Sequence, residues 1–302
     1  MVEVETVIKN AVPGLGEGPF WEEKTQSLLF VDLTGGIVHR WHSKTNQMEK
    51  VSFGTYTGFA IPHSRGGYVA GVGNKILHFQ WDAPKDGKVL AEVEKGLPNR
   101  LNDAKCDPKG RLFAGSMKID TNPATLIPGQ GNLYRLDADG TISRCREKCT
   151  ISNGLGWSPD NKTMYFIDSR PGVVYAYDYD VTTGDICNER TIFDMSGEEV
   201  GPSGLKPCPD GMTVDTDGNL WVAVFEGSRL INLDPSGKIL REIALPARRI
   251  TSCCFGGENY DELYVTSAMF GLNLEQDPLA GSVFRIKGLG CKGGPAVSYQ
   301  GV

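Results

Sequence analysis

The chain has 302 residues, 40% of them hydrophobic, and a formal net charge of −6. This is the composition of a globular protein with enough apolar residues for a large core. The acidic balance and the scattered Lys and Arg residues argue against nucleic acid or an anionic membrane as a partner. The first residues lack the pattern of a secretory signal, and no apolar run approaches the roughly 18 residues of a membrane span. We therefore expect a cytoplasmic protein.

The cysteine pattern fits reduced thiols better than a disulfide framework. The chain has 8 cysteines, and a chain of this length can build a core without disulfide staples. The motif CREKC at residues 145–149 is the one close pair separated by a gap. No second pair or nearby histidine completes a zinc site with it.

One sequence pattern repeats six times along the chain. Each copy holds a turn, a short apolar run, a second turn and an alternating strand. In chain order, the apolar runs begin near residues 28, 68, 112, 164, 220 and 263. The spacing of roughly 40 to 55 residues matches a four-stranded propeller blade. A two-sheet sandwich or a barrel would not by itself produce a six-fold repeat.

Local patterns within the copies indicate strands. The stretches VVYAYDYD (173–180) and RLINLD (229–234) alternate apolar and polar residues with period two. The turns DADG, DTDG and DPSG separate pairs of such stretches. The sequence therefore predicts an all-β fold, a single six-bladed β-propeller domain over residues 1–302.

Polar residues precede several of these apolar runs. Glu17 lies in GLGEGPFW before the first run, and a cluster of Arg100, Asn102 and Asp103 lies in PNRLNDAKCDPKG before the third. Each motif alone is also typical of a solvated turn. In a strand, Arg100 and Asn102 would face one side and Asp103 the other.

The fourth and fifth copies repeat this feature. Asn153 in ISNGLGWSPD and Asp210 in CPDGMTV each stand before a glycine and an apolar residue. Asparagine and aspartate favour turns on their own account. However, equivalent residues of different blades meet near a propeller axis, so Glu17, Asn102, Asn153 and Asp210 are predicted to form a ring of oxygen ligands.

Such a ring suits a hard divalent cation, because it offers carboxylate and amide oxygens and no thiol or imidazole. Calcium, magnesium or manganese fit best, and zinc could bind with the help of water. The alternative is a purely structural polar plug. The four histidines lie in the first two copies and away from these positions, which argues against a His-centred base. His39 and His42 are expected on the surface of a strand.

Several long motifs resemble one protein family. GEGPFW, NRLNDAKCDPKGRLFAGSM, SNGLGWSPDNKTMYFIDS and PDGMTVDTDGNLWVA are similar to the regucalcin (senescence marker protein) and gluconolactonase family. The resemblance covers nearly the whole chain. GSMKID and LWVAVFEGSRLI are similar to the insect luciferin-regenerating enzymes of the same family.

The resemblance implies a six-bladed propeller with one divalent metal on its axis. It implies Glu17, Asn153 and Asp210 as metal ligands, with Asp210 also in proton transfer. The implied activity is hydrolysis of sugar lactones such as glucono-δ-lactone.

The implied substrate-binding residues are Arg100, Asn102 and Asp120. Asp120 falls where vertebrate members carry a glutamate, and Ala104 stands where the family often has glycine. The segment before Asp210 is longer than in vertebrate members. Substrate choice is therefore the least transferable property, and the proton-transfer role could be shared with Asp103 or Asp120.

Three other functions compete with that of a lactonase. The same ligands would serve a calcium-binding regulatory protein without physiological turnover, or a luciferin-regenerating type of enzyme. A scaffold propeller that binds peptides would have no reason to repeat oxygen ligands at its blades. We expect a small-molecule sugar lactone as the partner, and a monomer or weak dimer.

Overall fold

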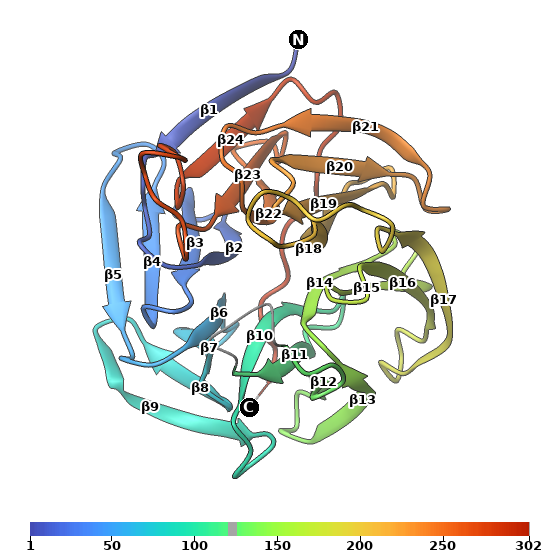
Figure 1. Cartoon of the computed structure of the whole chain (residues 1–302). Helices are drawn as coiled ribbons and strands as arrows, with labels where there is room; N and C mark the ends of the chain where they lie inside the picture. The colour runs from blue at the N-terminus through green and yellow to red at the C-terminus, as the bar shows by residue number, and fades with distance from the viewer. Residues whose placement is uncertain (120–125, 302) are drawn as a thin grey trace.

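The computed structural model describes residues 1–119 and 126–301. Over these residues it contains 24 strands and no helix, arranged as six four-stranded antiparallel sheets. The sheets stand around a central axis like the blades of a propeller (Figure 1). The predicted all-β, six-bladed fold is confirmed.

Each blade runs outward from an innermost strand. The first three blades are β2 (Gly16–Glu22), β3 (Ser27–Asp32), β4 (Ile37–His42) and β5 (Met48–Ser52); β6 (Thr57–Pro62), β7 (Tyr68–Val72), β8 (Lys75–Gln80) and β9 (Ala83–Glu92); and β10 (Asn99–Cys106), β11 (Leu112–Lys118), β12 (Gly131–Leu136) and β13 (Ile142–Cys149). The fourth and fifth are β14 (Ser152–Trp157), β15 (Thr163–Asp168), β16 (Val173–Tyr179) and β17 (Ile186–Asp194); and β18 (Cys208–Val214), β19 (Leu220–Phe225), β20 (Arg229–Leu233) and β21 (Ile239–Ala244). The sixth joins β22 (Ile250–Gly256), β23 (Glu262–Ser267) and β24 (Val283–Lys287) to β1 (Glu3–Ile8).

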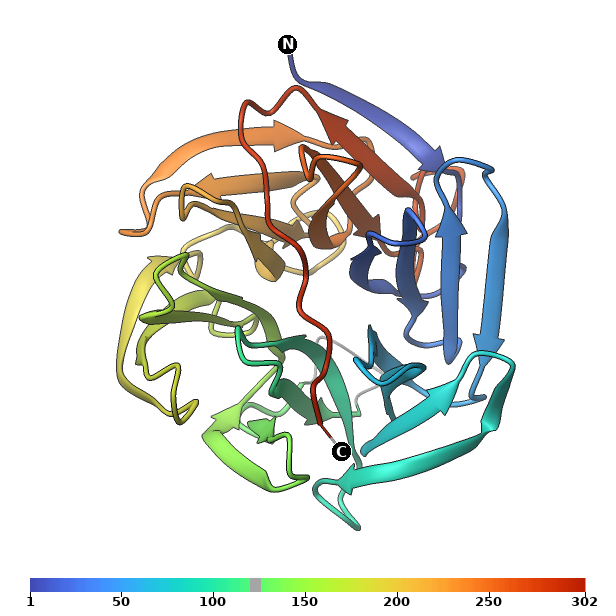
Figure 2. The same cartoon turned by 180° about the vertical axis from the view of Figure 1, so that it is seen from behind.

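The two ends of the chain close the molecule. Strand β1 pairs antiparallel with β24, so the N-terminal strand is the outer edge of the last blade (Figure 1). Residues 288–301 cross the opposite face of the propeller (Figure 2). This segment is tied down at both ends, since Thr216 N donates to Lys292 O at 2.9 Å and Tyr299 N donates to Pro62 O at 3.0 Å.

The apolar runs that reveal the repeat are the second strands of the blades rather than the innermost ones. Every residue of β3, SLLFVD, is buried. A second strand is covered on both faces by neighbouring blades, and a strand buried on both faces has a nearly continuous apolar sequence. The innermost strands precede these runs and carry the glycines and polar residues that face the axis.

His39 does not lie on the surface, contrary to the expectation from the sequence. Its side chain is buried on β4 and stacks on Phe30 with ring centroids 5.0 Å apart. The third strand of this blade is still covered by a neighbouring sheet, which the alternation of the strand alone does not reveal. His42 is only partly buried, and its ring contacts Glu49 at 2.9 Å.

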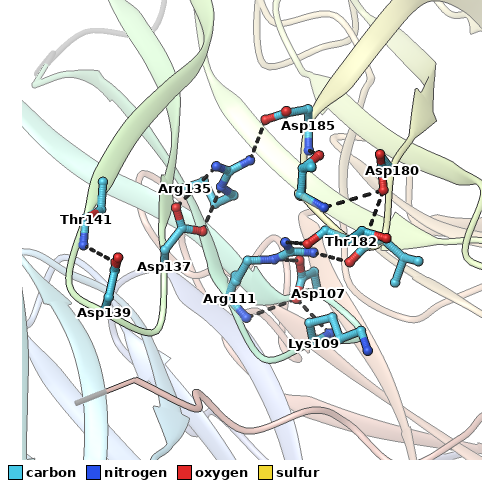
Figure 3. A network of polar contacts seen from close by, with 12 residues as sticks. Asp107, Lys109, Arg111, Arg135, Asp137, Asp139, Thr141, Asp180, Thr182 and Asp185 are labelled. Carbon is cyan, nitrogen blue, oxygen red and sulfur yellow. Dashed lines mark hydrogen bonds and ion pairs between the residues drawn. The ribbon is translucent and has the colours of Figure 1, made fainter.

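A buried ion pair of blade three makes hydrogen bonds to blade four near the face that the C-terminal segment crosses. Asp107, in the turn after β10, accepts from Arg111 Nε at 2.5 Å and from Tyr179 Oη at 2.7 Å. Arg111 reaches the turn after β16, where it donates to Thr182 O at 3.1 Å (Figure 3). It also donates to Val181 O at 2.8 Å. This network fixes blade three against blade four.

All eight cysteines, each within the described residues, are free thiols, as predicted. The described parts of the chain contain no helix that is long and apolar enough to cross a membrane.

Candidate metal and substrate site

The innermost strands share one irregularity near their first residues. Each begins with a regular antiparallel pair to the second strand, and the register shifts within the next four residues, as in a β-bulge. The six pairs are Gly16–Asp32, Thr57–Val72, Leu101–Ser116, Ser152–Asp168, Pro209–Val224 and Ile250–Ser267. The residue after each pair occupies an equivalent place in its blade. We call these the axial positions: Glu17, Gly58, Asn102, Asn153, Asp210 and Thr251.

Two of the axial positions cannot contribute a ligand. Gly58 has no side chain, and a Cβ atom there would lie 2.2 Å from Asn102 O. Thr251 has its hydroxyl engaged, because Oγ1 donates to Gly16 O at 2.5 Å and lies 2.9 Å from Thr266 Oγ1. The remaining four are the residues that the sequence predicted to meet, and all four line one cavity of about 230 Å³.

Asn102 is committed to contacts within the protein. Its Oδ1 accepts from Arg100 Nη1 at 2.7 Å, and its Nδ2 donates to Ser152 O at 2.9 Å. Arg100 and Asn102 therefore face the same side, as a strand requires. The predicted ring of four oxygens thus divides into three residues with available oxygens and Asn102, which holds Arg100.

Two of the other three residues have a buried oxygen without a donor, and the third, Glu17, has a buried carboxylate. Asn153 Nδ2 donates to Ser169 Oγ at 3.0 Å, which leaves its Oδ1 buried and without a hydrogen-bond partner among the described residues. Asp210 Oδ1 is likewise buried and has no hydrogen-bond partner among the described residues. The Glu17 carboxylate, also buried, accepts from Gly18 N at 3.2 Å.

Buried oxygens of this kind are costly unless a cation or donors satisfy them. The three residues offer two carboxylates and one amide oxygen, the donor set that hard divalent cations prefer. Over the described ranges, no group of three or more His, Cys, Asp or Glu residues could hold a metal. The amide of Asn153 is therefore needed to complete this site, and the residues present fit a divalent cation.

The pKa shifts of the charged residues in the cavity are also consistent with a cation site. Burial raises the pKa of Glu17 well above its usual value, and the charges of Asp210 and Asp103 add to this effect. Burial and the charge of Asp103 likewise raise the pKa of Asp210. Burial lowers the pKa of Arg100 to about 10, against the opposing charge of Glu17. A bound cation would favour the ionised carboxylates.

A second ring of side chains stands two residues before the axial positions. Residues two apart on a strand share a face, so these residues also point toward the channel. We call them the collar: Leu15, Tyr56, Arg100, Ile151, Cys208 and Arg249. All except Arg249 line the cavity, and its described apolar walls also include Met117, Ile119, Leu126, Phe225 and Phe270.

No single sequence motif indicated the collar. The collar residues could have been found in the sequence, because each lies two residues before an axial position and residues two apart on a strand share a face. Ser169, Arg170 and Thr34 also line the cavity and follow the ends of second strands, and none of them was predicted as a site residue. Asp120, predicted to bind substrate, lies outside the described residues.

Asp103 faces the other way, as predicted. It lines a separate cavity of about 380 Å³ on the far side of the axis, together with Lys105 and residues 294–297 of the C-terminal segment. Lys105 Nζ donates to Met212 O at 2.7 Å. The channel thus has two cavities. Of these, only the cavity of about 230 Å³ contains the available oxygens of Glu17, Asn153 and Asp210.

Comparison with known proteins agrees with this fold. The family model described as SMP-30/Gluconolactonase/LRE-like region matches residues 15–269. Regucalcin of Danio rerio is 43% identical over 304 residues, which is 99% of each chain. The structure of a luciferin-regenerating enzyme is 36% identical, with a TM-score of 0.89 over 99% of this chain and 100% of that one. A gluconolactonase from Xanthomonas campestris shares the fold, with 22% identity, a TM-score of 0.72 and coverage of 95% and 89%.

Proposed function

Because the chain belongs to the SMP-30/gluconolactonase/LRE-like family, we propose that it is a divalent-metal-dependent lactone hydrolase of the gluconolactonase type. One observation carries the proposal. The buried Oδ1 atoms of Asn153 and Asp210 line the cavity and have no hydrogen-bond partner among the described residues. Such atoms call for a cation, and an open cavity above them calls for a substrate.

Glu17, Asn153 and Asp210 would hold the metal. A divalent cation at this place would act as a Lewis acid toward the lactone carbonyl. Calcium, zinc, magnesium and manganese are the metals to compare, since oxygen ligands suit hard cations.

Arg100 is the proposed substrate-binding donor. Its guanidinium lines the cavity, is fixed by Asn102 Oδ1 at 2.7 Å and lies 5.6 Å from the Tyr56 ring. A donor that is already oriented needs no reorganisation when charge develops on substrate oxygen. Asn102 serves in this scheme by positioning Arg100, since both ends of its amide are engaged.

Asp210 is the proposed group for proton transfer. A carboxylate has two oxygens, so it can contact the metal through one and accept a proton at the other. A nearby divalent charge weakens it as a base, because it depresses the pKa of a carboxylate. Asp103 lies on the far side of the strand and would act only through its charge.

A calcium-binding regulatory protein without turnover is the second candidate, and the name regucalcin of the 43% identical relative favours it. A luciferin-regenerating type of reaction is the third, from the 36% identical structure. All three would use the same axial ligands. They differ in whether a lactone is consumed.

The test is a panel of aldonolactones assayed with Zn²⁺, Mn²⁺, Mg²⁺ and Ca²⁺. We expect metal-dependent turnover, and we expect Asn153→Ala to weaken the apparent metal affinity about tenfold or more. Asn188→Ala, an exposed change in the same blade, is the control and should leave both values unchanged. Turnover of no lactone, together with calcium binding, would replace the lactonase by the regulatory protein. Intact turnover in Asp210→Ala would refute the assigned role of Asp210.

A further inference from the structure

The collar contains two arginines that differ in their orientation relative to the cavity. Arg100 of blade three faces the cavity, whereas Arg249 of blade six is turned away from it. Arg249 Nε bonds Glu226 Oε1 at 2.5 Å, and its guanidinium also donates to Phe270 O. Its guanidinium carbon lies 5.3 Å from the Phe225 ring. The charged group therefore lies against the Phe225 ring and the backbone of Phe270, and Phe225 and Phe270 line the cavity whereas Arg249 does not.

Glu226 is held in a costly arrangement at this point. Its side chain is only 2% exposed, and its backbone is left-handed with φ 62°, which is unfavourable for a residue other than glycine. Ser203, from the long connection between β17 and β18, donates to its second oxygen at 2.8 Å. A buried ion pair of this kind also carries a desolvation penalty. The pair fixes Phe225, which directly precedes Glu226, and the backbone of Phe270.

The two rings form the apolar side of the site. Both line the cavity that contains Glu17 and Asp210, and Leu15 of the collar also lines it. Phe270 is 40% exposed although it is held by a buried arginine. An aromatic ring that is fixed but uncovered can gain free energy by burying an apolar ligand group. Hydroxyl groups packed against these rings would lose water without gaining a partner.

We propose that Phe225 and Phe270, positioned by the Arg249–Glu226 ion pair, form a subsite for an aromatic or alkyl substituent of the substrate. The preferred lactones then carry an apolar group on the ring instead of a full set of hydroxyls. This inference rests on the proposed lactonase activity and narrows its substrate class. Arg249 and Glu226 are positioning residues, since they touch the rings and not the substrate.

The test compares two δ-lactones that share the reacting ring, glucono-δ-lactone and a phenyl-substituted δ-valerolactone, on the metal-loaded protein. We expect the ratio of kcat/KM, phenyl over glucono, to exceed one. It should fall about tenfold in Phe225→Ala and in Phe270→Ala, the range that hydrophobic pockets give for lost apolar contact. Phe270→Leu should keep most of the ratio, and Ile239→Ala, an equally exposed change on the outer strand β21, should keep all of it.

The positioning pair has its own readout. Glu226→Gln and Arg249→Lys should raise KM for the phenyl lactone and leave its kcat nearly unchanged, because the rings lose their orientation and the reacting groups do not. A ratio below one that neither phenylalanine variant changes would overturn the subsite. So would equal losses on both lactones, which would mean that the rings stack on the sugar itself.

A binding measurement separates this inference from the proposed function. The phenyl-substituted δ-valerolactam, which is not hydrolysed in such an assay, is titrated into wild type and Phe270→Ala by calorimetry. Weaker binding to the variant without turnover of any lactone would support the subsite and refute the lactonase. Equal binding to both, with lactone turnover intact, would refute the subsite and keep the lactonase.

Discussion

At the scale of residues, the partners of a side chain decide its role more than its type does. Asn102 and Asn153 occupy equivalent axial positions. The oxygen of Asn102 accepts from Arg100, whereas the oxygen of Asn153 is buried and has no partner among the described residues. The first amide therefore fixes an arginine, and the second is available to a cation.

His39 provides a test of burial far from this site. Burial lowers its pKa to about 4, compared with roughly 6.5 in an unfolded chain. Between these values the unfolded chain binds a proton and the folded protein does not, so the free energy of unfolding falls as the pH is lowered through this window. We expect His39→Phe to lose about 2 kcal/mol less than wild type between pH 7.5 and pH 4.5, measured by urea unfolding at both values. Parallel losses in the two proteins would contradict the buried neutral histidine.

At the scale of elements, the turns after the innermost strands hold neighbouring blades together. The carboxylate of Asp107 is fully buried. It accepts from Arg111 Nε and from the backbone N–H groups of Lys109 and Arg111 (Figure 3). It also accepts from Tyr179 Oη. Arg111 in turn satisfies carbonyl groups of the next blade. This contact joins two blades whose described strands are not paired with each other.

Arg111→Met should therefore destabilise the protein by about 3 to 5 kcal/mol, because it leaves a buried carboxylate without its cation. The measurement is equilibrium unfolding in urea at neutral pH. The control is Arg190→Met, whose pair with Asp178 is about half exposed and should contribute no more than about 1 kcal/mol. Similar losses in the two variants would show that the buried pair has no special weight.

The sequence predicted the elements unevenly, for physical reasons. Second strands such as β3 and β19 are buried on both faces, so their apolar runs revealed the repeat. The innermost strands interrupt their pattern with bulges and glycines, and their polar residues became visible only when copies were compared. The Arg249–Glu226 pair joins two blades, and no local pattern predicts a contact between residues that the fold alone brings together.

At the scale of the whole molecule, closure of the ring positions the site. Strand β1 completes blade six by pairing with β24, which is far from it in the sequence. Residues 288–301 cross the face of the propeller that is seen from behind (Figure 2). The sequence of β1 does not indicate which strand it pairs with, so the pairing of β1 with β24 could not be predicted. Its consequence is that Glu17 of the first blade faces Asp210 of the fifth within one cavity.

The central claim is that one divalent cation, held by Glu17, Asn153 and Asp210, is required for lactone turnover. The most direct test is to strip the protein with a chelator and add the metal back in fractions of an equivalent, following binding heat and turnover in the same samples. We predict that both signals rise together and level off at one metal per chain, and that Glu17→Gln shifts both curves equally. Turnover that persists in the stripped protein, or that does not follow metal occupancy, would contradict the account.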